Sequence, residues 1–179
     1  MYNSNEIMEK CINEARKYSG FVSPNPCVGA ALVYNDDILF LDAHRCIGDP
    51  HAEVNVINKA LNSPQDIPLS SMELYVTLEP CSSFGKTPPC VDAIIKHGIK
   101  TVYIGTLDPN PNHAGHGIKI LQNSGIKVFT GILKYECDKL IEPFTKNMLL
   151  NKPYIFAKIG QTMDGYISDY EGVSKWITS

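Results

Sequence analysis

The sequence predicts an α/β protein, folded as a three-layer α/β/α sandwich around a mixed central sheet of about five strands. Three observations lead to this fold class. The chain has 179 residues, enough for one domain with a sizeable core, and 44% of them are hydrophobic. Two short apolar runs flank a turn at 35–37, as in an antiparallel hairpin. From residue 51 onward helical and strand-like segments alternate, which indicates parallel strands covered on both faces.

The first part of the chain predicts a helix, a hairpin and a second helix. The segment 5–19 predicts a helix, because its apolar residues recur on one stripe. The apolar runs 28–34 and 38–43 predict two strands, with Asn-Asp-Asp as the turn between them. The segment 51–61 predicts a helix that begins directly after Pro50.

In the middle of the chain, short apolar runs alternate with helical patterns, without an internal sequence repeat. The helix that opens at Cys90 is expected to end at Gly98, because glycine accepts the left-handed conformation at helix ends. The expected elements are a strand over 72–78, a helix over 90–97, a strand over 101–106, a helix over 115–123, a strand over 126–130 and a longer helix over 133–150.

The last stretch differs from the rest. Asn-Lys-Pro at 151–153 reads as a linker, and 154–159 and 163–167 read as short strands. About 25 residues cannot bury a core of their own. We therefore expect one domain over 1–150 and a tail over 151–179 that packs on it or begins a further domain.

Composition and charge exclude several classes of protein. The net charge of −3 lacks the basic excess typical of nucleic-acid binding. No apolar run of about 18 residues and no secretory pattern at the start is evident, so we expect no membrane association and a cytoplasmic location. The six cysteines are spread through the domain, which fits reduced thiols plus a metal site better than a disulfide framework.

Four residues predict the chemistry: His51, Glu53, Cys81 and Cys90. In mid-helix His51 and Glu53 would point about 200° apart, so they can share a site only off a helix end. Prolines place His51 and Cys90 at helix starts, where the partial positive charge favours thiolates. We expect one Zn²⁺ between two helix N-termini. Three ligands leave a fourth position open, as in catalytic rather than structural sites, with Glu53 as the acid–base group.

The cysteine spacing narrows the family. Zinc nucleobase deaminases show H-x-E followed by P-C-x-x-C, whereas eight residues separate Cys81 from Cys90 here. With this longer spacing the chain resembles the deaminase domain of the bifunctional RibD family of riboflavin biosynthesis, which has a cytidine deaminase-like fold. The stretches that carry the resemblance are S-P-N-P-C-V-G-A at 23–30, H-R-C-I-G-D-P-H-A-E-V at 44–54, T-L-E-P-C-S-S-F-G-K-T-P-P-C at 77–90 and D-P-N-P-N-H-A-G-H-G-I at 108–118.

The resemblance implies a reaction and a set of residues. The reaction is hydrolytic deamination of 2,5-diamino-6-(5-phosphoribosylamino)pyrimidin-4-one, with release of ammonia. The implied zinc ligands are His51, Cys81 and Cys90, with Glu53 as proton shuttle. The implied substrate-binding residues are Asn25 and His44 in the pocket, Lys86 at the phosphate, and Asp108 and Asn110 at the ribose-phosphate end or the pyrimidine. Ser83 departs from the family, which commonly has histidine there, and this puts in doubt any role of that position.

The tail resembles the opening of the reductase domain that follows in this family, a domain that resembles dihydrofolate reductase and uses NADPH. The matching segments are 158–165 and 174–178. We expect no reductase activity from this chain, since nearly all of that domain is absent. A homo-oligomer, as dimer or tetramer, is expected, and a separate reductase subunit is a candidate partner.

Two other functions remain open. The first is another zinc deaminase, acting on cytidine, guanine or tRNA adenosine; the long cysteine spacing and Lys86 argue against it. The second is a non-catalytic zinc-stabilised binding module; the missing basic excess and missing fourth ligand argue against that.

Overall fold

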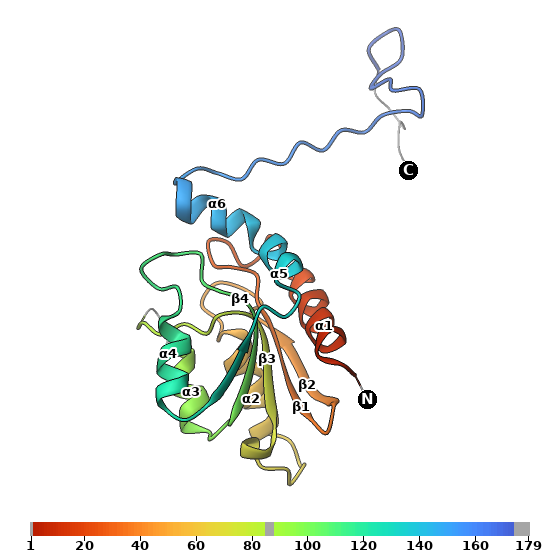
Figure 1. Ribbon diagram of the computed structural model, residues 1–179. Coiled ribbons are helices and arrows are strands. Elements are labelled where there is room, and N and C mark those ends of the chain that lie inside the picture. The colour runs from red at the N-terminus through yellow and green to blue at the C-terminus, as the bar shows by residue number, and fades with distance from the viewer. Residues whose placement is uncertain (1, 85–87, 174–179) are drawn as a thin grey trace.

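The computed structural model describes residues 2–84 and 88–173 and confirms the expected sandwich with a mixed five-stranded sheet (Figure 1). The strand order is β2-β1-β3-β4-β5. The strand β1 runs antiparallel to both its neighbours, whereas β3, β4 and β5 are parallel. The strands are β1 (Gly29–Tyr34), β2 (Asp37–Ala43), β3 (Glu73–Leu78), β4 (Thr101–Thr106) and β5 (Lys127–Thr130).

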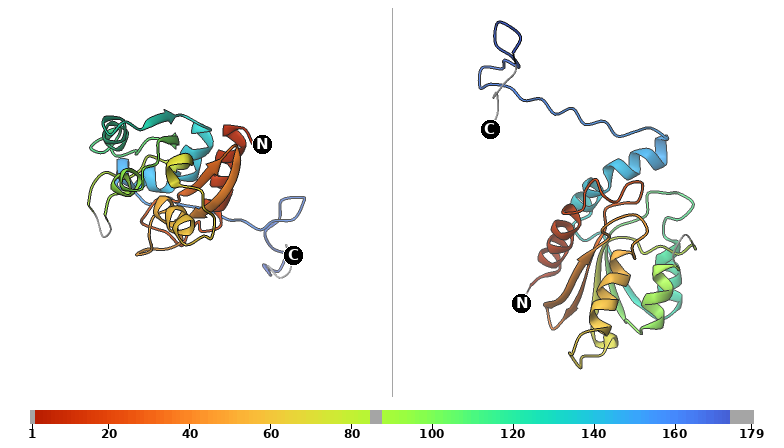
Figure 2. Two further views of the ribbon diagram at one scale, coloured as in Figure 1. Left: turned by 90° about the horizontal axis from the view of Figure 1, so that it is seen from below. Right: turned by 180° about the vertical axis from the view of Figure 1, so that it is seen from behind.

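Helices cover both faces of the sheet, as the alternating pattern predicts (Figure 2). The helices α1 and α5 lie on one face, and α2, α3 and α4 lie on the other. The helices are α1 (Ser4–Arg16), α2 (Ala52–Leu61), α3 (Cys90–Lys96), α4 (His116–Asn123), α5 (Lys134–Leu140) and α6 (Glu142–Leu150), with a short 3-10 helix η1 (Leu69–Ser71).

The alternation of side chains along β1 divides the core into two layers. Ala30 and Leu32 pack toward α2 and α3, and Ala31 and Val33 pack toward α1. All four side chains are fully buried. Since both faces of the sheet bury apolar side chains, the positions left for polar chemistry are the ends of the strands, where the loops lie.

One expected element divides in two. The helix predicted over 133–150 is wrong in this respect, because α5 ends at Leu140 and α6 begins at Glu142. Ile141 between them has φ −103° and ψ 11°, and Pro143 lies in the first turn of α6. A proline in mid-helix removes a hydrogen bond and clashes with the preceding turn, whereas a first turn tolerates it. The sequence therefore restarts the helix and changes its direction.

The tail contradicts a second expectation. Neither 154–159 nor 163–167 forms a strand in the structure, although Thr162 and Tyr166 pair across a turn. The extended segment after α6 leads away from the domain (Figure 1), so no strand edge is beside it to satisfy its backbone groups. Among the helices of residues 2–84 and 88–173, none combines the length and the apolar character needed to cross a bilayer.

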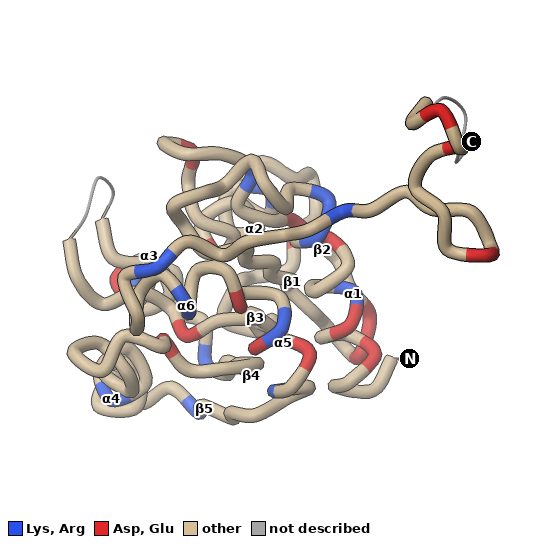
Figure 3. Tube along the Cα trace, turned by 90° about the horizontal axis from the view of Figure 1, so that it is seen from above, with Lys and Arg blue, Asp and Glu red and all other residues tan. Residues whose placement is uncertain are grey.

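Charged residues of both signs are interspersed over the described part of the chain (Figure 3). This distribution matches the small net charge of −3. The buried exceptions are informative, because burying a charge is costly unless it is paired or hydrogen-bonded. They are Asp42, Glu53 and Glu79, which are 2%, 3% and 5% exposed.

Candidate active site

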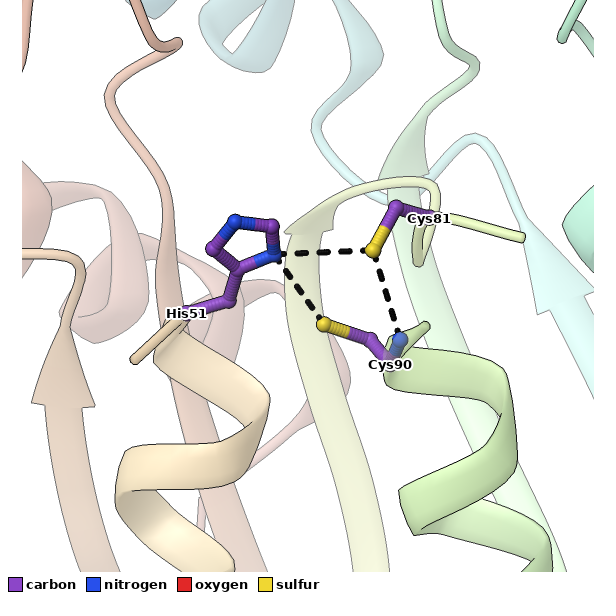
Figure 4. Close-up of side chains that lie close together, drawn as sticks. All are labelled: His51, Cys81 and Cys90. Atoms are coloured by element: carbon purple, nitrogen blue, oxygen red, sulfur yellow. Dashed lines mark hydrogen bonds between the residues drawn. The ribbon is translucent and has the colours of Figure 1, made fainter. Parts of the chain in front are cut away.

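Two helix starts meet beside the end of β3. His51 is the N-cap of α2, with extended backbone at φ −68° and ψ 163°, and Cys90 is the first residue of α3. Cys81 follows the end of β3 and lies opposite both (Figure 4). The prediction of a cluster between two helix N-termini is therefore confirmed.

The three side chains converge closely. His51 Nδ1 lies 3.2 Å from Cys90 Sγ and 3.5 Å from Cys81 Sγ. One ligand atom from each residue lies within 4.8 Å of the others. With Zn–S near 2.3 Å and Zn–N near 2.0 Å, a tetrahedral site needs S···N separations of about 3.5 Å. Two thiols and one imidazole at this spacing fit Zn²⁺.

The backbone of α3 favours a negative charge on Cys81. The first amide of that helix, the N–H of Cys90, donates to Cys81 Sγ at 3.3 Å. The hydrogen bond between the two thiols, together with one from His51, lowers the pKa of Cys81 well below its ordinary value. The same thiol pair raises the pKa of Cys90, which is also buried. Hydrogen bonding to Cys81 raises the pKa of His51.

Glu53 lies in the first turn of α2, next to the cluster and away from water. Burial, followed by the charge on Cys81, raises the pKa of its carboxyl group to about 7. A carboxyl group with this pKa exchanges protons readily at neutral pH, which suits a general acid–base. Glu53 and His51 line the same cavity, so the helix end does bring them together.

That cavity, the zinc-side cavity, has a volume of about 230 Å³. Its walls include two of the predicted substrate-binding residues, Asn25 and His44. His44 Nδ1 lies 3.2 Å from the carbonyl oxygen of Pro50, and Nε2 lies 3.0 Å from Asn25 Nδ2. The residues lining the cavity are Asn25, Pro26, Val28, His44, His51, Glu53, Leu78, Glu79, Cys81, Asp108 and Phe144.

A second cavity of about 210 Å³, the loop-side cavity, adjoins the first and shares Glu79, Cys81, Asp108 and Phe144 with it. Asp108 lines both cavities, and Asn110 lines the second. Its lining residues are Glu79, Pro80, Cys81, Ser82, Ser83, Asp108, Asn110, His113, Phe144 and Met148. The structure thus brings eight of the nine predicted site residues to one place: Asn25, His44, His51, Glu53, Cys81, Cys90, Asp108 and Asn110.

The ninth, Lys86, lies outside the described residues. Ser83, where the RibD pattern commonly has histidine, lines the loop-side cavity. His113, which the sequence did not single out, also lines that cavity with a half-buried side chain. Its approach to Asp108 depends on how the 108–118 loop folds back.

Two further residues escaped the sequence reading. Phe144 of α6 lines both cavities although it lies 54 positions after Cys90 in the chain. Glu79 lies within the T-L-E-P-C motif, yet its carboxylate bonds to a loop about 30 residues away. The signal in the sequence was a glutamate placed directly after an apolar strand pattern and inside the motif.

The chain is similar to known zinc deaminases. A family model for the cytidine and deoxycytidylate deaminase zinc-binding region matches residues 1–106, which include His51, Cys81 and Cys90. The riboflavin biosynthesis protein RibD of Aquifex aeolicus is 44% identical over 172 residues. That match covers 96% of this chain and 47% of the relative.

Two solved structures match as well. A diaminohydroxyphosphoribosylaminopyrimidine deaminase/5-amino-6-(5-phosphoribosylamino)uracil reductase from Thermotoga maritima has a TM-score of 0.88 and 44% identity, over 98% of this chain and 50% of its own. RibD of Acinetobacter baumannii has a TM-score of 0.82 and 38% identity, over 98% of this chain and 48% of its own. This chain therefore spans about half the length of the relatives it matches.

Proposed function

Because this chain belongs to the cytidine and deoxycytidylate deaminase zinc-binding family, and is similar to RibD proteins over 96% of its length, we propose that it is a riboflavin-pathway deaminase. Its substrate is 2,5-diamino-6-(5-phosphoribosylamino)pyrimidin-4-one. Hydrolysis replaces the ring amino group with oxygen, gives 5-amino-6-(5-phosphoribosylamino)uracil and releases ammonia.

One observation carries the proposal. A His-Cys-Cys cluster with ligand atoms within 4.8 Å lies beside a buried carboxyl group whose pKa is raised to about 7, on a shared cavity. Three protein ligands leave a zinc ion one open position, as catalytic sites require. A structural site has no use for a protonatable carboxyl group beside that position.

The residues divide the work as follows. Zinc held by His51, Cys81 and Cys90 would supply a nucleophile derived from water at neutral pH. Glu53 accepts protons one at a time from the attacking water and passes one to the ring nitrogen and one to the departing amine, which leaves as ammonia. Asn25 and His44 orient the pyrimidine in the zinc-side cavity, whose volume of about 230 Å³ suits a single ring.

The ribose and phosphate need a second space, and the loop-side cavity adjoins the first. Asp108 and Asn110 bind this end of the substrate. Lys86 lies in the sequence between Cys81 and Cys90, and this position supports a role for its cation at the phosphate. A phosphate gains strong charge-assisted hydrogen bonds from such a group.

Ammonia release from the phosphoribosyl-diaminopyrimidine tests the proposal, with the dephosphorylated compound, cytidine, guanine and tRNA as comparison substrates. We expect turnover of the phosphorylated compound at a kcat/KM at least about tenfold above the others. Lys86→Ala should remove this preference for the phosphate. Equal turnover of both pyrimidines would overturn the role of Lys86, and preference for cytidine, guanine or tRNA would overturn the substrate.

The remaining properties are proposed on the resemblance alone. Deamination by this chain does not depend on NADPH, which belongs to the reductase reaction. The chain acts in the cytoplasm as a homo-oligomer, dimer or tetramer, and a separate reductase subunit is a candidate partner. A turnover assay with and without NADPH tests the first of these points, and sedimentation of the purified chain tests the oligomeric state.

A further inference from the structure

Glu79 is a buried carboxylate that directs no chemistry in the scheme above. It follows the end of β3, two residues before Cys81, and is 5% exposed. Four backbone amides of the 108–118 loop and the start of α4 donate to it. Oε2 accepts from the N–H of Asp108 at 3.2 Å and of Gly115 at 2.9 Å; Oε1 accepts from the N–H of Gly117 at 2.9 Å and of Ile118 at 3.4 Å.

These four hydrogen bonds, and not an ion pair, stabilise the negative charge of the Glu79 carboxylate. In the part of the chain that the structure describes, no lysine or arginine forms an ion pair with Glu79. The carboxylate instead occupies the N-terminus of α4, where free amides and the helix dipole favour a negative charge. Hydrogen bonds to a charged acceptor are stronger than neutral ones, and buried ones are the most costly to lose.

The bonds fix the loop in one place relative to the zinc cysteines. Gly117 lies so close to the end of β3 that an added Cβ atom would meet the carbonyl oxygen of Pro80 at 2.3 Å and Glu79 Oε1 at 3.3 Å. Any larger residue would push the start of α4 away from the carboxylate. The loop and the strand end that leads to Cys81 are therefore joined by direct contact.

A series of hydrogen bonds connects Glu79 to the proposed substrate-binding residues Asp108 and Asn110. The amide of Asp108 bonds to Glu79, and the side chain of Asp108 accepts from the amide of Asn110 at 2.8 Å. Asn110 Oδ1 in turn accepts from the amide of Asn112 at 3.0 Å. Each of these bonds joins a side-chain oxygen to the backbone amide two residues further on, which is an Asx turn. The two turns hold the side chains of Asp108 and Asn110 where they line the loop-side cavity. Loss of the first bond releases the whole series.

We propose that Glu79 is a positioning residue, which holds the loop carrying Asp108 and Asn110 against the end of β3 and so sets the affinity for the ribose-phosphate half of the substrate. This inference rests on the proposed function for its kinetic consequence, though not for its structural one. The hydrogen bonds of the Glu79 carboxylate all go to backbone amides of the loop and of the start of α4, so we expect its loss to weaken binding more than it slows chemistry.

Glu79→Gln tests the proposal, because glutamine keeps the shape but turns an amide N–H₂ toward two backbone donors. We expect KM for the phosphorylated substrate to rise about tenfold or more, the loss of roughly one charge-assisted hydrogen bond, with kcat within about threefold. The zinc content should not change. Glu73→Gln is the matched control, since Glu73 lies at the opposite end of β3 and contacts Tyr103.

A second variant disturbs the contact between Glu79 and the start of α4 by changing the helix and not the carboxylate. Gly117→Ala leaves Glu79 intact and displaces the start of α4 from it. It should raise KM in the same way and keep zinc, even if Glu79→Gln does not fold. An unchanged KM in both variants, or a fall in kcat without a rise in KM, would overturn the positioning role.

Hydrogen exchange separates this inference from the proposed function. Amides of residues 108–118 should exchange at least about tenfold faster in Glu79→Gln than in the wild type and in Glu73→Gln, with no substrate present. Protection equal to the wild type would overturn the inference. If the wild-type protein releases no ammonia, the proposed function fails, whereas the exchange result still decides whether Glu79 holds the loop.

Discussion

The amide nitrogen of Asn25 donates to Nε2 of His44 at 3.0 Å. The opposite ring nitrogen, Nδ1, lies 3.2 Å from the carbonyl oxygen of Pro50, which can only accept. His44 therefore carries its proton on Nδ1, and Nε2 is the acceptor. Burial lowers the pKa of His44, which keeps the ring neutral. In the proposed function, this pair would orient the amide oxygen of Asn25 toward a donor on the substrate.

This coupling predicts non-additive substitutions. Asn25→Ala and His44→Ala should each lower kcat/KM, and the double variant should lose less than the product of the two, by about 0.5–3 kcal/mol. Kinetics of the four proteins measure this difference. As a control pair, Asn25→Ala and His97→Ala should be additive within about 0.5 kcal/mol, because His97 caps the far end of α3. Additivity in the first pair would mean that His44 does not orient Asn25.

Glu53 offers a sharper separation of binding from chemistry. Glu53→Gln keeps the volume of the side chain but removes its proton transfer, so kcat should fall by at least about 10²-fold. The zinc content and the thermal midpoint should stay near those of the wild type, since Glu53 is not one of the three clustered ligands. Metal analysis and ammonia release on the same preparation provide the measurement. Full activity in this variant would exclude Glu53 as the acid–base group.

The cysteines differ in role, and one substitution pair shows it. Cys81→Ser should lose bound zinc, because Cys81 Sγ lies 3.5 Å from His51 Nδ1 in the cluster. Cys46→Ser is the matched control, since Cys46 is exposed and its thiol donates to Asp49, away from the cluster. Free zinc at a concentration 100 times its dissociation constant stabilises the folded protein by about 2.7 kcal/mol. A chelator should therefore lower the thermal midpoint of the wild type and of Cys46→Ser. We expect the chelator to leave the thermal midpoint of Cys81→Ser unchanged. A normal zinc content in Cys81→Ser would contradict Cys81 as a ligand.

The sequence predicted the clustering of His51, Cys81 and Cys90 because its determinants are local. Pro50 and Pro89 each precede the start of a helix. They therefore set His51 and Cys90 at helix N-termini through local sequence alone. The same holds for the sheet, where runs of apolar residues alternate with helices. The order β2-β1-β3-β4-β5 combines one hairpin, a connection through α2 that passes over β1 from β2 to β3, and two parallel crossovers from β3 to β4 and from β4 to β5.

The misses have a common physical cause, which is dependence on tertiary contacts. Glu79 and the 108–118 loop meet only after β3 and β4 pair, so no spacing in the sequence reveals their bonds. Phe144 reaches the cavities because a new helix begins at Glu142 with Pro143 in its first turn, and that proline is a local signal in the sequence. The strands predicted over 154–159 and 163–167 are wrong because strand propensity is a local property, whereas a strand forms only beside the edge of another strand.

A last prediction concerns stability and pH, through Asp42 at the end of β2. Asp42 is 2% exposed and pairs with Arg45 and Lys59, whose nitrogens each lie 2.8 Å from Oδ2. Burial alone would raise the pKa of Asp42, but the hydrogen bonds from Arg45 and Lys59 outweigh it and leave the pKa below its ordinary value of 3.8. The unfolded chain therefore takes up this proton at a higher pH than the folded protein does.

The stabilisation from Asp42 is consequently complete above about pH 3.8 and is lost as the pH falls through the lower pKa of the folded state. Asp42→Asn should lower the free energy of unfolding at pH 7 by about 1 kcal/mol, a modest amount because both cations are partly exposed to water. Below pH 3.8 the difference between variant and wild type should shrink. Denaturant unfolding at pH 7, 4 and 3 measures it, with exposed Asp66→Asn as the control. A difference that stays constant with pH would show that the loss at pH 7 comes from packing and not from the charge of Asp42.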